Sequence, residues 1–361
     1  MKVRQIVPGE PLDAETRAEL DGAILTRDIR VGGGRWSKGR RLSREDLTTL
    51  ASEDLGPTGN DEPVTLLIQE PGELHEDDAA LRLAEAVRGG PSSMEIRGPS
   101  QSRVDLVATA DGVVAIRLAA LERLNRLDPL EVFTVFDGQI VAPGDLVASI
   151  KVGPHLVDER VLAAGERLAQ RGGPVVRVLP FRAGLPIAVL VQERIEGVPR
   201  ERFEASVRAK VEGLGARLTT IDYVGGAAAD VTAAMARALA GAPAQDAAAI
   251  VLTAGGGSTD PTDPFFLAVE ALGGVIVRHG VPAHPGSMVW LGRVGRAAVV
   301  GLPSCGAYSR ATAADLLLPR LVAGEPPTAT TVARLGHGGI LNRHQRFRFP
   351  AYARELEAPE G

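Results

Sequence analysis

Residues 247–274 read AAAIVLTAGGGSTDPTDPFFLAVEALGG, and this stretch decides the fold. An apolar run ends in three glycines, a polar loop follows, and an apolar helical pattern begins after Asp263. That order is typical of a strand, a loop and a helix. From Pro174 onward the same alternation recurs along the chain. It predicts βαβ units, and therefore an α/β fold with a doubly wound, mostly parallel sheet and helices on both faces.

The rest of the chain divides around this pattern. Further strands of the sheet are expected at residues 186–193, 219–225, 275–282, 288–295 and 296–304, and its helices at 200–218, 228–241 and 314–324. The first 173 residues have a mixed α/β pattern that can hold two small subdomains. Helices are expected in this region at 42–52 (with Ser43 as N-cap), 75–90 and 158–173. Strands are expected at 24–31, 62–70 and 146–153. Residues 105–128 are expected to form a hairpin or strand pair that runs into a helix. We therefore expect a mixed α/β region at 1–173, a C-terminal domain at 174–325, and an arm and tail at 326–361.

Composition narrows the class of protein. The 361 residues are 45% hydrophobic, enough to form packed cores, and the length suggests two or three domains. A net charge of −5 argues against a nucleic-acid partner, so the basic clusters at 35–41 and 343–348 are interpreted as solvated charges. The single cysteine, Cys305, excludes an intramolecular disulfide. The first residues have no apolar segment and no run of 18 apolar residues occurs, so we expect a soluble, cytoplasmic protein without membrane contact.

The junction from Thr253 to Asp263 is the first candidate site. Ligands of doubly wound sheets bind beyond the carboxyl ends of the strands. Glycines let the backbone approach a ligand closely, and bare N–H groups there can bind phosphate. Asp260 and Asp263 are candidates for holding a divalent metal ion or the N–H groups of a ligand. The competing interpretation makes the glycines turn residues and both aspartates helix caps.

Two further loops strengthen the hypothesis of a binding site. The sequence HPGS at 284–287 precedes an expected strand, and GLPSCG at 301–306 follows another. With TAGGGS at 253–258 and ALGG at 271–274, this order resembles the molybdopterin-binding domain of the molybdopterin molybdotransferase family, over about residues 185–325. The resemblance implies that these loops surround molybdopterin or the molybdenum cofactor.

The resemblance also implies individual residues for the site. The candidate cofactor-binding residues are Thr253, Gly255, Gly256, Gly257, Ser258, Pro285, Gly286, Ser287, Gly301, Leu302, Pro303 and Ser304. Asp260 and Asp263 are the candidate catalytic and metal-binding residues, with Mg²⁺ as the metal ion.

A wider resemblance covers the whole chain. GAILTRDIR at 22–30, PGDLVASIKV at 143–152 and RLGHGGIL at 334–341 are similar to the molybdopterin-binding part of proteins fused to a molybdenum-cofactor cytidylyltransferase. No nucleotidyltransferase signature is present. The Thr-Gly-Asp-Glu that molybdotransferases carry after the first strand is replaced by QERIEG at 192–197, and their Gly-Asn-Pro by SCG at 304–306. We therefore expect the binding geometry to be retained, whereas the metal-insertion machinery departs from the family pattern.

Three functions stay open at this point. The first is a molybdotransferase-like enzyme that inserts molybdate. The second is a non-catalytic carrier or sensor that acts with a separate cytidylyltransferase or a molybdoenzyme. The third is a nucleotide-dependent enzyme, which is disfavoured because neither GxGxxG after the first strand nor GxxxxGK[ST] occurs. The resemblance also implies a homo-oligomer.

Several residues outside the main motifs carry alternative interpretations. A role in lining the pocket competes with a packing or loop role for Cys305, His284, Glu193 and Glu196. Exposed loop charge is favoured over an anion site for Lys151, His155 and Arg103. The acidic first turn of a helix is favoured over a metal site for residues 75–78.

Overall fold

The computed structural model describes residues 1–52, 62–90, 92–100, 102–192, 200–242, 244–256, 259–303, 311–326 and 328–356. The chain forms two compact units. Unit 1 comprises residues 1–109, 116–137 and 143–177, and unit 2 comprises residues 110–115, 138–142 and 178–361. Within the described ranges, no helix is both long and apolar enough to span a membrane.

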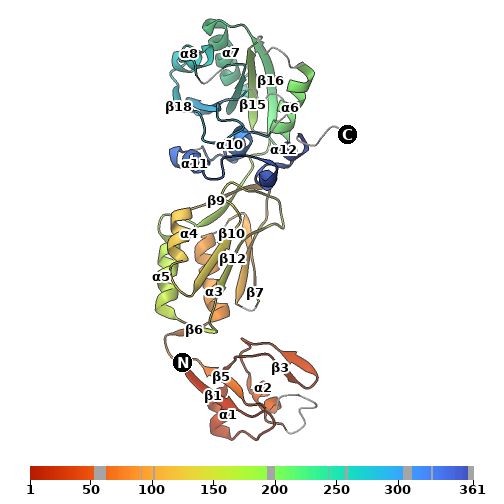
Figure 1. Ribbon diagram of the computed structural model, residues 1–361, viewed down its shortest axis with the longest axis vertical. Helices are drawn as coiled ribbons and strands as arrows, with labels where there is room; N and C mark the ends of the chain where they lie inside the picture. Colours follow the sequence, from red (N-terminus) through yellow and green to blue (C-terminus); the bar gives the residue numbers. More distant parts are fainter. Residues whose placement is uncertain are drawn as a thin grey trace. The chain divides into compact units, whose positions relative to one another are not determined.

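The N-terminal part of unit 1 is a small β-sheet with two helices. Strands β1 (Lys2–Ile6), β5 (Val64–Ile68) and β2 (Ile24–Leu25) pair antiparallel in the order β1-β5-β2, and β3 (Ile29–Val31) pairs with β4 (Gly34–Trp36). Helices α1 (Ala14–Leu20) and α2 (Arg44–Leu50) accompany this sheet (Figure 1). Ser43 caps α2 in a capping box with Asp46, which confirms the predicted helix start.

The remainder of unit 1 has a four-stranded antiparallel sheet in the order β10-β12-β8-β7. These strands are β7 (Met94–Ser100), β8 (Arg103–Ala108), β10 (Leu130–Thr134) and β12 (Leu146–Val152). Helix α3 (Glu76–Arg88) packs on this sheet and against α5 (Glu159–Gln170), which also contacts α4 (Leu118–Leu124). Two short strands, β6 (Glu73–His75) and β13 (Leu156–Asp158), pair beside the start of α3.

The hairpin or strand pair expected within residues 105–128 is wrong in its pairing. Strand β8 belongs to the four-stranded sheet, whereas β9 (Gly112–Ile116) lies between β11 (Ile140–Val141) and β14 (Val176–Pro180) in another sheet. A Cβ atom on Gly112 would lie 2.3 Å from the carbonyl oxygen of Leu179. The glycine therefore permits a close approach of two strands rather than a hairpin turn.

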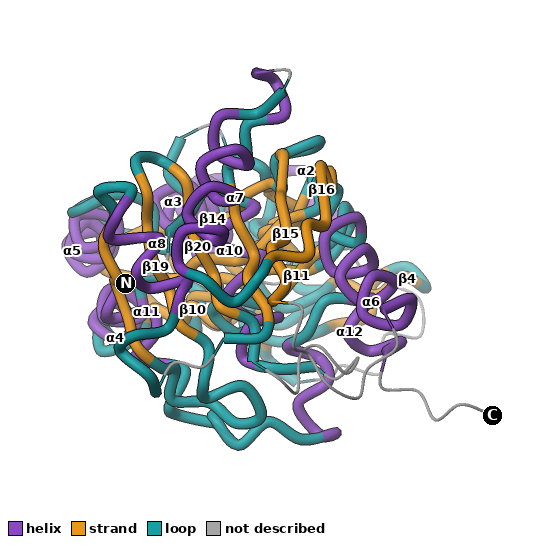
Figure 2. The backbone as a smooth tube through the Cα atoms, turned by 90° about the horizontal axis from the view of Figure 1, so that it is seen from above, coloured by secondary structure: helices purple, strands orange, loops and turns teal. Residues whose placement is uncertain are grey.

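Unit 2 is built on a six-stranded sheet in the order β16-β15-β17-β20-β19-β18. Figure 2 shows β16 and β15 toward one side of this sheet, and β20 and β19 toward the other. The strands are β15 (Pro186–Gln192), β16 (Arg217–Val224), β17 (Ile250–Ala254), β18 (Val275–His279), β19 (Trp290–Val294) and β20 (Ala297–Gly301). Strands β16, β15, β17 and β20 run parallel, and β19 is antiparallel to both β20 and β18. The predicted α/β fold with a mostly parallel sheet is confirmed.

Helices cover both faces of this sheet. The helices are α6 (Arg200–Glu212), α7 (Ala228–Ala240), α8 (Pro264–Ala271), α10 (Ala313–Val322), α11 (Ala329–Arg334) and α12 (Ala351–Leu356). Phe203 of α6 and Leu317 of α10 belong to the apolar core on one face, and Met235 of α7 and Phe265 of α8 to the core on the other. Figure 1 shows α7 and α8 on one side of β15 and β16, with α6 on the opposite side. Burial of these aliphatic and aromatic side chains is the main stabilising term for the unit.

A buried ion pair joins two of these helices, and a tyrosine joins a third helix to it. Lys210 Nζ on α6 lies 2.5 Å from Asp315 Oδ1 on α10, and both side chains are almost fully buried. The Tyr352 hydroxyl on α12 donates to the same oxygen at 3.1 Å, and Thr312 N donates to Oδ2 at 2.8 Å. These hydrogen bonds offset the cost of removing two charges from water, because both carboxylate oxygens have partners.

The tyrosine of this network is expected to resist ionisation. Burial, followed by the charge of Asp315 and the hydrogen bond to it, raises the pKa of Tyr352 well above 10. The folded state therefore holds this proton more tightly than the unfolded state, so its stabilisation is complete below pH 10 and is lost as the pH rises further. Subtracting the phenolate absorbance of Tyr352→Phe from that of the wild type during an alkaline titration should show no ionisation of this residue until the unit unfolds. A normal titration near pH 10 in folded protein would contradict the buried pairing.

Candidate functional site

The three loops singled out from the sequence leave the sheet at one edge. Thr253 of β17 pairs with Gly301 of β20, which pairs with Trp290 of β19, which pairs with His279 of β18. Strand β18 is antiparallel to β19 and therefore runs in the same direction as β20. The loops after Ala254, after Gly301 and after His279 thus begin at the carboxyl edge, where doubly wound sheets bind ligands.

A hydrogen bond and close packing against adjacent residues fix the first residues of the glycine-rich loop. Thr253 is buried, and its carbonyl oxygen accepts a hydrogen bond from Leu302 N at 2.8 Å, which joins this loop to the Gly-Leu-Pro loop. Gly255 has a φ of 99°, in the left-handed region that favours glycine. A Cβ atom on Gly256 would lie 2.6 Å from Asp263 Oδ2, so only glycine fits here without displacing that carboxylate. Gly257 and Ser258 lie outside the described residues.

The two aspartates of this loop accept hydrogen bonds from residues that closely follow them in the chain. Asp260 is exposed, and its Oδ1 accepts from Thr262 N at 2.8 Å and Thr262 Oγ1 at 2.7 Å. The bond from the Thr262 hydroxyl, and then the one from its backbone, lowers the pKa of Asp260. Asp263 is buried and is the N-cap of α8, accepting from Phe265 N at 2.8 Å. Asp263 is therefore a helix cap, as the competing interpretation predicts, whereas Asp260 closes a turn within the loop by bonding to Thr262. The catalytic and metal-binding roles of both residues stay predictions.

In the part of the chain that the structure describes, no group of three or more His, Cys, Asp or Glu side chains is placed to hold a metal ion. A protein-only cage like those of structural zinc sites is therefore absent from these ranges.

The cap on α8 can be tested by substitution. Asp263→Ala should lower the free energy of unfolding of unit 2 by about 1 kcal/mol, because a first-turn N–H loses its acceptor. Asp263→Asn should cost much less, since asparagine caps helices as well as aspartate does. Urea denaturation of both variants measures the difference. Equal losses in the two variants would mean that the charge of Asp263, rather than its hydrogen bond, stabilises the fold.

The Pro-Gly loop is packed against the beginning of α10. Ala313 N donates to the carbonyl oxygen of Pro285 at 3.0 Å, and Gly286 has a φ of 104°. A Cβ atom on Gly286 would lie 2.6 Å from Ala313 N, so the close approach requires glycine. Val281 N donates to the carbonyl oxygen of Ser287 at 3.0 Å and closes the loop.

A C-terminal segment also lines this loop. His284 N donates to the carbonyl oxygen of Gly339, and Leu341 N donates to that of His284, both at 2.7 Å. Residues 339–341 therefore run beside the Pro-Gly loop as a short extended segment. The His284 side chain is exposed, and a role in ligand binding stays a prediction for it.

The Gly-Leu-Pro loop begins at a glycine that packs directly against the buried indole ring of Trp290. A Cβ atom on Gly301 would lie 1.8 Å from Trp290 Nε1, so the ring occupies the space that a side chain would need. Trp290 in turn packs edge-on against Phe266 at a centroid distance of 4.9 Å. Leu302 and Pro303 are buried. Ser304 and Cys305 of this loop, and Glu193 and Glu196 after β15, lie outside the described residues.

Sequence reasoning missed two groups of residues around this edge. One is the buried network of Lys210, Asp315 and Tyr352, which fixes the start of α10 against the Pro-Gly loop. The one hint of this network in the sequence is TAAD at 312–315, a pattern typical of a capping box. The structure has this capping box at the start of α10. The other is Arg200 with Tyr223, which lie at the carboxyl end of β16 and have no motif of their own.

Most of the candidate metal-binding and anion-binding residues of unit 1 form hydrogen bonds within the fold. His75 is the N-cap of α3, with Nδ1 accepting from Asp77 N at 3.1 Å, as the helix-start interpretation predicts. His155 Nδ1 lies 2.9 Å from Glu76 Oε1. Arg103 donates to Asp105 at 2.8 Å, and Lys151 is exposed on β12.

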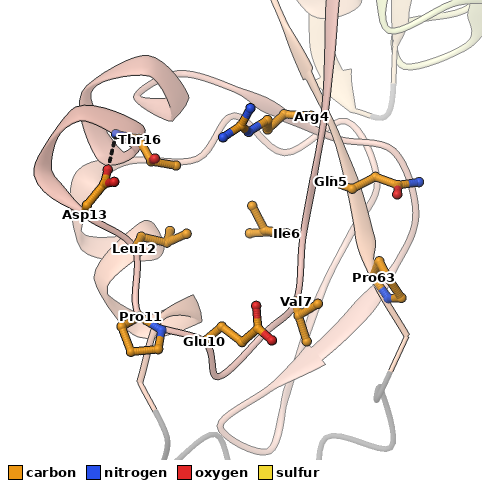
Figure 3. Close-up of a pocket in the computed structure, with 10 residues that line it drawn as sticks. All are labelled: Arg4, Gln5, Ile6, Val7, Glu10, Pro11, Leu12, Asp13, Thr16 and Pro63. Atoms are coloured by element: carbon orange, nitrogen blue, oxygen red, sulfur yellow. Dashed lines mark hydrogen bonds between the residues drawn. The ribbon is translucent and has the colours of Figure 1, made fainter.

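Unit 1 also contains a pocket of about 340 Å³, between β1 and the start of α1. Figure 3 shows Arg4 and Glu10 on opposite sides of it, with Ile6 and Leu12 between them. Asp13 at its rim caps α1 by accepting from Thr16 N at 2.7 Å. None of the predicted cofactor-binding residues lines this pocket.

Comparison with known proteins bears on unit 2. Residues 187–323 match a family model described as "Probable molybdopterin binding domain". A solved molybdopterin biosynthesis moea protein from Pyrococcus horikosii is 13% identical, over 71% of this chain and 76% of its own, with a TM-score of 0.29. A "Putative molybdenum cofactor biosynthesis protein" from Corynebacterium diphtheriae is 17% identical, over 44% of this chain and 99% of its own, with a TM-score of 0.27. No curated protein matches the chain.

The matched segment contains nearly all of the six-stranded sheet and the three loops at its carboxyl edge. Residues 187–323 of this chain therefore form a domain of the probable molybdopterin-binding type.

Proposed function

We propose that the protein binds molybdopterin, its adenylylated form or the finished molybdenum cofactor across the loops at 253–263, 284–287 and 301–306. The observation that carries this proposal is the convergence of the three loops at the carboxyl edge of a sheet whose segment matches the molybdopterin-binding family. Backbone N–H groups of glycine loops suit anionic and hydrogen-bonding ligands, because no side chain blocks their approach.

Two roles for this binding differ in their chemistry. In the first, the protein inserts molybdate into the bound pterin, and Asp260 and Asp263 position Mg²⁺ or the adenylylated phosphate. Mg²⁺ is commonly held by only one or two carboxylates together with substrate phosphates, so this pair has a suitable chemistry. In the second, the protein is a carrier that hands the cofactor to a separate cytidylyltransferase or a molybdoenzyme.

The carrier role is favoured by the hydrogen bonds of the two aspartates. Asp263 is buried as the cap of α8, and Asp260 accepts two bonds from Thr262. A carboxylate that binds Mg²⁺ in such a place must share or give up these partners, which costs binding energy. The replacement of Thr-Gly-Asp-Glu after β15 also supports this choice.

Turnover distinguishes the two roles. The wild-type protein is incubated with adenylylated molybdopterin, molybdate and Mg²⁺, and the AMP released is quantified beside the ligand that stays bound. A carrier should return the adenylylated ligand intact. AMP release by the wild type that is lost in Asp263→Asn, with ligand binding unchanged, would instead establish molybdate insertion. Asparagine is the suitable replacement because it retains the helix cap.

A further inference from the structure

One arginine at the carboxyl edge lies over the ring of a tyrosine. Arg200 is the first residue of α6, and its guanidinium carbon lies 4.1 Å from the centroid of the Tyr223 ring. Tyr223 is the next-to-last residue of β16, and its hydroxyl donates to Glu204 Oε1 at 3.0 Å. Figure 2 shows α6 beside β16, at the end of the sheet away from β19.

The hydrogen bond to Glu204 fixes the tyrosine ring as a platform. Burial, and then this bond, raises the pKa of Tyr223, so the hydroxyl keeps its proton to a higher pH than an exposed tyrosine does. Glu204 therefore accepts the hydrogen bond of the tyrosine hydroxyl. Among the described side chains, no carboxylate forms an ion pair with Arg200. Stacking uses the face of a guanidinium and leaves the N–H groups at its edge available, which suits two parallel hydrogen bonds to a phosphate.

The position of Tyr223, over which Arg200 lies, relative to the glycine-rich loop follows from the strand register. Tyr223 pairs with Val191 of β15, and Val191 pairs with Ala254 of β17, directly before Gly255. Neighbouring strands lie about 4.8 Å apart, so the Tyr223 backbone is roughly 10 Å from the start of the glycine-rich loop. A ligand that reaches both must carry its anionic group at about this distance from the part held by the glycines.

We propose that Arg200, stacked on Tyr223, binds the phosphate group of the ligand whose ring system lies at the glycine-rich loop. The ligand is then a phosphorylated pterin, with its phosphate toward β16 and its rings toward β17 and β20. This assignment rests on the proposed function in its carrier form, in which Asp260 and Asp263 hold no phosphate, and it orients the same ligand in the same site. It makes Arg200 a binding residue that selects phosphorylated over unphosphorylated pterins.

The test compares one pterin in two forms. Fluorescent oxidised molybdopterin is titrated into the protein before and after removal of its phosphate by a phosphatase. The wild type should bind the phosphorylated form roughly 10- to 100-fold more tightly, the usual range for hydrogen bonds to charged groups. Arg200→Met should bind both forms with the affinity that the wild type has for the dephosphorylated one. Arg208→Met is the matched control, because Arg208 lies on the same helix, is about half exposed and pairs with Glu212.

The outcomes separate this assignment from the proposed function. A phosphate preference that survives in Arg200→Met, or a loss of affinity for both forms alike, would overturn the role of Arg200 while pterin binding stands. Binding of neither form by the wild type would overturn the proposed function, and the assignment with it.

Discussion

Replacing Lys210 with methionine is expected to lower the free energy of unfolding of unit 2 by about 3–5 kcal/mol, the usual cost of removing one partner of a buried ion pair. The substitution leaves the Asp315 carboxylate fully buried without its positive partner. The remaining donors, Tyr352 and Thr312, are neutral and cannot replace the charge. The effect should extend to the Pro-Gly loop, because the helix that Asp315 caps also holds the Pro285 carbonyl oxygen.

The measurement needs a probe that reports on unit 2 alone. The chain has two tryptophans, so Trp36→Phe leaves only the buried Trp290 as an emitter. Urea denaturation followed by this emission gives the stability of unit 2. The control is Arg208→Met, which removes an exposed i,i+4 pair on the same helix and should change stability by about 0.5 kcal/mol or less. Similar losses in both variants would mean that the Lys210 pair contributes no more than a surface pair.

Adding a single methyl group at Gly301 is expected to lower the free energy of unfolding of unit 2 nearly as much as replacing Lys210 does. In Gly301→Ala the new Cβ would lie 1.8 Å from Trp290 Nε1 and 2.2 Å from its Cδ1, so the indole must move. The ring is buried and packs against Phe266, which leaves it little room. We expect a loss of about 3 kcal/mol, toward the upper end of the cost of overpacking, and a red shift of the Trp290 emission.

Gly226→Ala is the matched control for this methyl group. Gly226 follows β16 in the same unit, and no atom lies within 4 Å of the position that its Cβ would take. Its stability and its Trp290 emission should therefore stay close to those of the wild type. An unchanged emission in Gly301→Ala would contradict the contact between the indole and this glycine.

The sequence predicted the strand–loop–helix units of the C-terminal half well, because their signals are local. The apolar run before Thr253, the glycines and Asp263 before Pro264 each define an element boundary without information from elsewhere in the chain. The same holds for the capped helix that begins after Ser43. The shared edge of the three loops follows from the parallel arrangement, which the alternation of strands and helices predicts.

Features that depend on distant partners could not be predicted in this way. Strands β8 and β9 are adjacent in sequence but pair in different sheets, because Gly112 allows close contact with the backbone at Leu179. Lys210 has the spacing of an ordinary helix residue, and its partner Asp315 lies 105 positions later. The capping role of Asp263 was one of two open interpretations, since the same residue types bind metals and cap helices. Asp260, expected as a second cap in that interpretation, bonds to Thr262 within the loop.

The central claim, that the loops at the carboxyl edge bind molybdopterin, is tested most directly by calorimetry. Molybdopterin is titrated into the wild type, Gly256→Val and the control Gly226→Ala, each first shown to be folded by its Trp290 emission. We predict saturable binding by the wild type and the control. In Gly256→Val binding should be lost or at least about 10-fold weaker, because its side chain displaces the Asp263 carboxylate. No binding by the folded wild type, or equal binding in Gly256→Val, would contradict the account.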